Sequence, residues 1–153
     1  MPVPRLCLSH DVIASTAAVR RRRCGTRWLP PPANWQEIIR RTWPALIRHP
    51  NWRVPGGWCD LMLAMADHLE GRQITIIEAF EDLVMGRLQV VHTWRRGVVQ
   101  DDESNVIIHY YESLSASTCR ECGDPGEPVR RGTGRLATMR VLCEQHRYGD
   151  VGV

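Results

Sequence analysis

The sequence predicts an α+β fold: helices, a small antiparallel sheet and a C-terminal zinc finger of treble-clef or ribbon type. Three observations support it. Apolar residues recur at helical spacing in the first half, β-branched residues alternate in the middle, and cysteine and histidine form two close pairs near the end. We expect a basic N-terminal arm over residues 1–33, an α+β body over 34–117 and a zinc-finger module over 118–150.

Two helices are expected in the first half of the body. Asn34 can cap a helix that runs from Trp35 to about Trp43, in which apolar residues recur at intervals of three and four. Residues 58–70 give the clearest helical pattern, and Gly71 follows at the position of a left-handed C-cap. The tryptophan and methionine residues of this second helix are interpreted as core residues.

The rest of the body reads as two strands and a third helix. Residues 73–79 and 87–94 are rich in β-branched residues and flank a turn at Met85-Gly86. An acidic run from Asp101 then favours a helix start, because carboxylates stabilise the positive end of the helix dipole. Residues 106–115 continue with helical spacing, with a strand over 106–111 as the alternative.

The last third contains two close pairs of metal-ligand residues, C-x2-C at Cys119 and Cys122 and C-x2-H at Cys143 and His146, twenty residues apart. Each pair can bind one ion from a single backbone turn, which is the spacing of a structural zinc site. Gly123 allows a tight turn whose amides can point at the thiolates. We therefore expect one structural Zn²⁺ bound by these four residues.

A short hairpin, from residues 128–131 to 136–142, is expected between the ligand pairs, and a helical turn from Cys143 to His146. Catalytic zinc is disfavoured, because four protein ligands leave no position for water. An H-N-H nuclease is disfavoured because residues 123–142 contain neither His nor Asn. We expect a protein that is not an enzyme.

The charge is distributed unevenly around a net +3, and all twenty basic residues are arginine. Residues 1–58 hold ten Arg and two acids, residues 59–118 four Arg and ten acids, and residues 119–153 six Arg and five acids. The basic N-terminal segment and the acidic middle segment can fold against each other, or they can present surfaces of opposite charge to partners.

Arginine interleaved with Trp28, Trp43 and Trp52 is typical of a surface that binds nucleic acid, although buried tryptophan and solvated arginine explain the pattern too. The acidic middle can instead imitate nucleic-acid phosphates toward a host protein. The candidate nucleic-acid or partner-binding residues are Arg20, Arg21, Arg22, Arg23, Arg27, Arg40, Arg41, Arg130 and Arg131. The candidate acidic partner face is Glu78, Glu81, Asp82, Asp101, Asp102 and Glu103.

The chain contains no apolar run of the roughly 18–20 residues that span a bilayer, and its start lacks the pattern of a secretory signal. With metal-ligand spacing for three of the six cysteines, this predicts a reducing bacterial cytoplasm. Cys7, Cys24 and Cys59 are then expected as free thiols.

Several motifs together resemble a family of small, mostly uncharacterised phage and prophage zinc proteins. The resemblance covers about residues 56–147 and is loosest over residues 81–88. It implies a phage-related, cytoplasmic, non-enzymatic protein. The matching motifs are Gly57-Trp58 with Asp60-Leu61, Glu78-Ala79-Phe80, Ser117-Thr118-Cys119 before C-x2-C-G, and Leu142-Cys143-Glu144-Gln145-His146.

The expected function is binding to a host protein or protein–nucleic-acid complex, which modulates or inhibits a host macromolecular machine in the manner of an anti-defence or anti-CRISPR protein. Tryptophan and arginine are frequent interface anchors, and the uneven charge suits such a role. The alternative is a regulatory protein that binds DNA or RNA through its Arg/Trp-rich N-terminal region and its finger.

Overall fold

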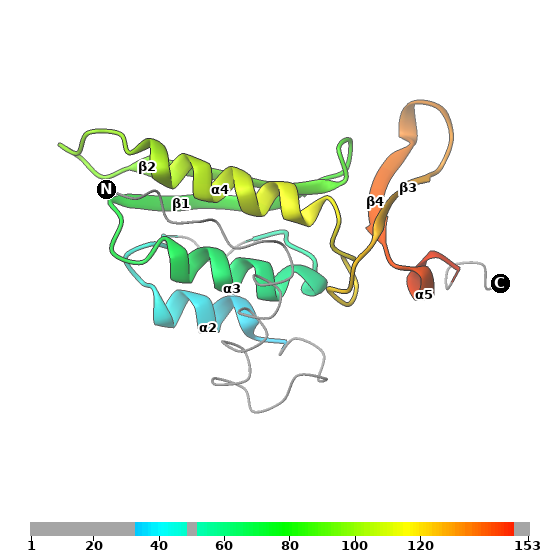
Figure 1. The fold of residues 1–153 in the computed structure, drawn as a ribbon, viewed down its shortest axis with the longest axis horizontal. Coiled ribbons are helices and arrows are strands. Elements are labelled where there is room, and N and C mark those ends of the chain that lie inside the picture. The colour runs from blue at the N-terminus through cyan, green and yellow to red at the C-terminus, as the bar shows by residue number, and fades with distance from the viewer. Residues whose placement is uncertain (1–32, 49–51, 149–153) are drawn as a thin grey trace.

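The structure, a computed structural model, describes residues 33–48 and 52–148. Over these residues the predicted α+β class is confirmed, with two separate two-stranded antiparallel sheets (Figure 1). The elements in order are α2 (Trp35–Thr42), η1 (Gly56–Trp58), α3 (Cys59–His68), β1 (Ile74–Asp82), β2 (Arg87–Trp94), α4 (Asp102–Ser115), β3 (Glu127–Arg131), η2 (Gly134–Leu136), β4 (Thr138–Leu142) and α5 (Glu144–Arg147).

The body is layered around α3. In Figure 1, α3 lies between α2 on one side and the β1–β2 hairpin with α4 on the other. Every residue of α3 from Cys59 to Ala66 except Asp60 is buried, because apolar side chains surround this helix. Trp35 and Ile39 of α2 pack into the same core. The apolar spacing that predicted these helices is therefore their contact surface.

The β1–β2 hairpin runs in register from Ile74 opposite Trp94 to Asp82 opposite Arg87, with an irregularity between Ile76 and Glu78. Its turn ends at Gly86, whose φ of 66° suits glycine. One face of the hairpin is buried in the core, through Ile74, Ile76, Ala79, Leu88 and Val90.

Both outer edges of this hairpin are covered, although a two-stranded sheet has two edges that can pair with other chains. On the β1 side, the Ile76 amide donates to the Leu46 carbonyl at 2.7 Å and the Arg53 amide donates to Ala79 at 3.0 Å. On the β2 side, two side chains of α4 replace a strand. Ser115 Oγ accepts from the Leu88 amide at 2.7 Å, and Glu112 Oε1 accepts from the Val90 amide at 2.8 Å.

Two details of the sequence expectation are wrong. Asn34 lies at the N-cap of α2, but its side chain makes no capping hydrogen bond. The strand alternative over residues 106–111 is excluded, because these residues lie within α4. Asp101 caps α4 as its acidic run suggested, since its carboxylate accepts from the Glu103 amide at 2.9 Å. The division into arm, body and finger stays a prediction.

Candidate metal centre

The first ligand pair lies on a tight loop after α4. The Cys119 amide donates to the Asp124 carbonyl at 2.7 Å, and the Gly123 amide donates to the Cys119 carbonyl at 2.9 Å. Gly123 has a φ of 84°, which a residue with a side chain rarely adopts. These bonds fold the loop back so that Cys119 and Cys122 face the same point, as the predicted turn requires.

The second ligand pair lies where β4 passes into α5. Cys143 occupies the N-cap position of α5 and His146 lies within that helix. The antiparallel β3–β4 hairpin leads the chain back from the first pair to the second. A loop with two cysteines, a hairpin and a short ligand-bearing helix follow one another as in a treble-clef finger.

The four ligand atoms converge, since all lie within 4.8 Å of one another. Cys122 Sγ is 3.7 Å from Cys143 Sγ, and His146 Nδ1 is 3.6 Å from Cys119 Sγ and 3.1 Å from Cys143 Sγ. Around a tetrahedral zinc, ligand atoms would be separated by about 3.5–3.8 Å. The Cys122–Cys143 and Cys119–His146 separations fit this range, and the Cys143–His146 separation is shorter. The group can hold one metal ion.

Burial and hydrogen bonding act in opposite directions on the cluster thiols. Burial disfavours the Cys119 thiolate, but the amides of Cys143, Cys122 and Glu121 donate to it and lower its pKa from 9.0 to about 7. The pKa of Cys122 is raised instead, by burial and by the adjacent thiols of Cys143 and Cys119. A bound cation would offset this repulsion and stabilise all three thiolates.

The first-pair loop is packed directly against the body at Gly57. The Gly57 amide donates to the Arg120 carbonyl at 2.9 Å. A Cβ on Gly57 would lie 2.5 Å from that oxygen and would also overlap the Cys119 carbonyl. Nearby, the buried indole of Trp58 donates to the Thr118 carbonyl at 2.8 Å. Only a glycine permits this approach, so the metal centre and the body share a backbone contact.

An ion pair lies at the same junction. Arg120 Nε is 3.0 Å from Glu81 Oε1, and the Glu81 side chain is 6% exposed. Neither atom has a hydrogen-bond partner, so this is a charge contact without hydrogen-bond alignment. Burial is the main cause of the raised Glu81 pKa, which Arg120 and Arg140 partly oppose. Glu81 therefore connects the body to the finger through a buried side chain.

These junction residues are the part of the site that motif spacing missed. The sequence predicts Trp58 as the start of a helix and Gly57-Trp58 as a motif of the family resemblance, but neither as a contact with the finger. The available signal is the glycine pair Gly56-Gly57, because glycine is the residue that permits a close backbone approach.

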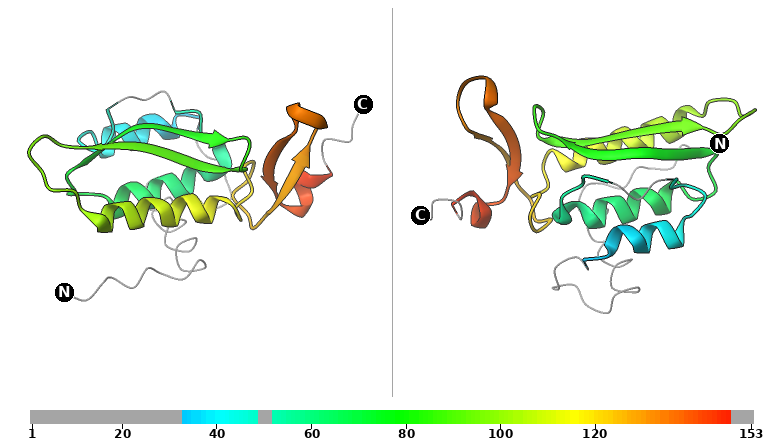
Figure 2. Two further views of the ribbon diagram at one scale, coloured as in Figure 1. Left: turned by 90° about the horizontal axis from the view of Figure 1, so that it is seen from above. Right: turned by 180° about the vertical axis from the view of Figure 1, so that it is seen from behind.

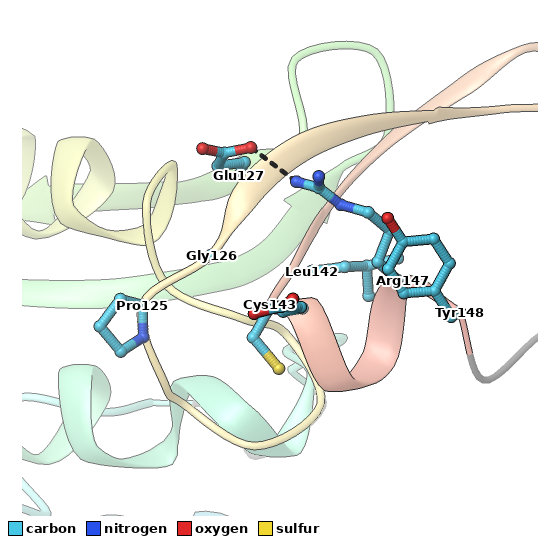
Figure 3. Close-up of a pocket in the computed structure, with 8 residues that line it drawn as sticks. Pro125, Gly126, Glu127, Leu142, Cys143, Arg147 and Tyr148 are labelled. Carbon is cyan, nitrogen blue, oxygen red and sulfur yellow. Dashed lines mark hydrogen bonds and ion pairs between the residues drawn. The ribbon is translucent and has the colours of Figure 1, made fainter.

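A hollow of about 430 Å³ lies beside the cluster, between β3, β4 and α5 (Figure 3). Arg147 donates to Glu127 at 2.6 Å across it, as the dashed line shows. Cys143 and Tyr148 also line the hollow. Glu127 and Arg147 are paired with each other, and the third charged residue of the lining, Glu144, is exposed.

The candidate acidic face is not one surface. Asp82 accepts from the amides of Val84 and Met85 at the hairpin turn, close to Glu81. Asp101, Asp102 and Glu103 begin α4 at the opposite end of the hairpin. Most of the six acids have partners within the chain: Glu78 pairs with Arg53, Glu81 with Arg120, and both Asp101 and Glu103 with Arg72. Their role toward a partner stays a prediction.

The candidate arginines are also separated. Arg20–Arg23 and Arg27, like Trp28, lie outside the described residues. Arg40 and Arg41 are exposed on α2 and bond to Glu37, at 2.6 and 2.8 Å, which lowers the pKa of Glu37 from 4.5 to about 2. Arg130 and Arg131 lie on β3, far along the chain.

The tryptophan part of the predicted nucleic-acid surface is wrong where the structure describes it. Trp43 and Trp52 are only 4% and 6% exposed, because both pack into the body core. They cannot stack on bases. The burial of these two tryptophans does not test the predicted role of the arginines, which stays a prediction.

The Cys119, Cys122, Cys143 and His146 group is consistent with a zinc finger. Comparison of the chain with protein-family models, curated proteins and solved structures gives no match. No helix in the described part of the chain has the length and apolarity to span a membrane.

Proposed function

We propose that the protein is a non-enzymatic, zinc-stabilised interaction protein of phage or prophage type, which binds and modulates or inhibits a host macromolecular machine. The observation that supports it most is the closed four-ligand centre, in which three cysteines and one histidine converge on one point. Such a centre gives a metal no open position for a substrate, so its role is to hold a fold.

The way the finger joins the body supports a role in binding. The shared backbone at Gly57 and the Glu81–Arg120 pair fix the finger at one end of the body, beside the β1–β2 turn (Figure 2). A finger held in one orientation presents a preorganised surface, which lowers the entropic cost of association.

The test is capture followed by reconstitution. The tagged, full-length protein is mixed with nuclease-treated bacterial lysate, and each captured protein is then purified and recombined with it. We expect a stoichiometric complex by size-exclusion chromatography with light scattering, and a loss of the partner's activity. Failure of every captured protein to form such a complex would contradict the proposal, as would turnover of a substrate by the purified protein alone.

A further inference from the structure

The arginines of the described residues differ in whether the chain neutralises them. In the body, Arg40 and Arg41 pair with Glu37, Arg53 with Glu78, and Arg72 with Asp101 and Glu103. The body arginines without an ion pair are spread over several elements, whereas the hairpin holds four within residues 130–140. In the β3–β4 hairpin, Arg130, Arg131, Arg135 and Arg140 form no ion pair with any residue of 33–48 or 52–148. The hairpin therefore carries positive charge that the chain itself does not neutralise.

The hairpin sequence accentuates this charge. Residues 128–142 contain four arginines, no acidic residue and no aromatic residue. The acid just before them, Glu127, is already bound to Arg147 at 2.6 Å. A net positive strand pair without local carboxylates is the electrostatic pattern of a phosphate-binding surface.

The free side of the hairpin is β3 with its loop. β4 faces the body, since the Met139 amide donates to the Leu83 carbonyl at 2.7 Å. β3 and the loop project away from the body in all three views (Figures 1 and 2). Arg130 on β3 and Arg135 in the loop are exposed. Arg131 is half-buried, and its guanidinium donates to the Arg147 carbonyl at 3.0 Å.

We propose that the β3 side of this hairpin binds the phosphate backbone of double-stranded DNA through Arg130 and Arg135. The planar guanidinium group pairs with phosphate oxygens in a bidentate manner. Single-strand binding would rely on aromatic side chains that stack on bases, and the hairpin has none. A two-stranded ribbon fits a B-DNA major groove of roughly 12 Å, whereas the A-form RNA groove is too narrow and deep.

This DNA contact does not rest on the proposed protein-binding function. The cluster gives the hairpin its fixed base, because Cys143 follows β4 directly and the first-pair loop precedes β3. The arginines then lie on a rigid element, which limits the backbone entropy lost on binding.

The test is fluorescence anisotropy of the full-length protein with a labelled random-sequence duplex of about 24 base pairs, over about 50–200 mM NaCl. We expect micromolar binding at the lowest salt. R130Q/R135Q should weaken it roughly tenfold and reduce the slope of log K against log salt by about 2, since each phosphate contact contributes about 0.9.

R48Q/R96Q is the matched control. It removes the same two charges from exposed arginines, but those arginines lie on the body and outside the hairpin. We expect less than a twofold change. Metal content measured on every variant shows whether the finger is intact.

The inference would be overturned by equal weakening in both double variants or by loss of binding only on Arg20–Arg23→Gln. Tighter binding to single-stranded DNA or duplex RNA, or no DNA binding at low salt, would overturn it too. A host-protein complex that survives R130Q/R135Q would leave the proposed function standing independently. An acidic protein partner that R130Q/R135Q releases, without any DNA binding, would also overturn the DNA assignment.

Discussion

At the scale of single residues, three of the four cysteines in the described part of the chain converge and one does not; Cys7 and Cys24 lie outside that part. Cys119 and Cys143 are buried within the cluster, and Cys122 reaches it from an exposed loop. Cys59 is buried in α3 and belongs to the body core. Burial alone therefore does not distinguish a ligand from a core cysteine; the C-x2-C and C-x2-H spacing does.

Cys143→Ser should abolish stable metal retention, because a serine hydroxyl is a poor zinc ligand and the remaining three donors leave the site open. We expect the metal content of purified protein to fall to a small fraction of one equivalent. Cys59→Ser is the control, since Cys59 lies outside the cluster and its substitution should leave metal content unchanged. Equal metal content in both variants would contradict the assignment of Cys143 as a ligand.

Gly57→Ala tests the shared backbone at the junction. The added Cβ would lie 2.5 Å from the Arg120 carbonyl oxygen, so the loop must move. Overpacking of this kind costs about 1–3 kcal/mol, and we expect the apparent metal affinity to fall with it. Gly97→Ala is a useful comparison: its φ of 78° is strained for alanine, but nothing lies within 4 Å of the new Cβ. It should reduce stability in urea without changing metal affinity.

At the scale of elements, α4 supplies the hydrogen-bond acceptors that a third strand would offer to the β1–β2 hairpin. Ser115 and Glu112 accept hydrogen bonds from the two β2 amides at its free edge. Both side chains lie on the buried face of α4, since their residues are almost fully buried. A helix thus protects a strand edge that would otherwise be open to pairing with another chain.

Ser115→Ala should destabilise the body by about 1–3 kcal/mol, because the Leu88 amide would remain buried without an acceptor. Urea unfolding measures this loss, and amide exchange at Leu88 localises it. Ser113→Ala, on the exposed face of the same helix, removes a bond to the His109 carbonyl and should cost much less. Equal costs for the two variants would show that the edge bond is unimportant.

The carboxyl group of Asp101, at the N-cap of α4, makes the stability of the fold depend on pH. The hydrogen bond from Ser104 is the main cause, with Arg72 and the Glu103 amide, of an Asp101 pKa below its usual 3.8. A carboxyl group with a lowered folded-state pKa stabilises the fold above its unfolded-state pKa. That stability is lost as pH falls through the lower, folded-state value.

Asp101→Ala should therefore reduce the unfolding free energy by about 1 kcal/mol at pH 7, the usual cost of losing an N-cap. The difference in unfolding free energy between this variant and the parent protein should shrink as the pH falls below the ordinary Asp pKa. It should vanish in stronger acid. Denaturant unfolding at a series of pH values measures it. A difference independent of pH would show that the Asp101 charge does not matter.

Sequence patterns predicted the main helices and strands of the described residues well, because the apolar residues that these elements bury recur at helical or alternating spacing. α3 and the β1–β2 hairpin follow directly from their apolar patterns, and the ligand set follows from cysteine spacing. The pattern could not show which arginines are neutralised. Arg40 and Arg41 form pairs within one helix turn, whereas Arg120 finds Glu81 only through the fold. Nor could it show that Trp43 and Trp52 are buried, since an Arg/Trp-rich segment suits both a core helix and a binding surface.

At the scale of the whole molecule, the body and the finger depend on each other. Trp58 belongs to the body core, and its indole donates to the carbonyl of Thr118, the residue before the first ligand. The finger has only a small core of its own, formed by Cys119, Leu142 and Cys143 with Val129. So small a core cannot hold a fold without a crosslink or a metal.

Removal of the metal should therefore destabilise the body as well as the finger. With chelator present, we expect the finger to lose its fixed structure and the body to lose part of its stability, because the contacts at Gly57 and Glu81 are lost together. Tryptophan fluorescence would report the change at Trp58, and returned Zn²⁺ should reverse it. Unchanged unfolding with and without chelator would contradict the structural role.

The most direct test of the central claim is the metal content of the full-length protein, measured by elemental mass spectrometry after purification without added metal. A structural centre built from Cys119, Cys122, Cys143 and His146 predicts one equivalent of zinc per chain. Zinc at well under one equivalent, in protein that is nevertheless folded and resistant to chelator, would contradict it.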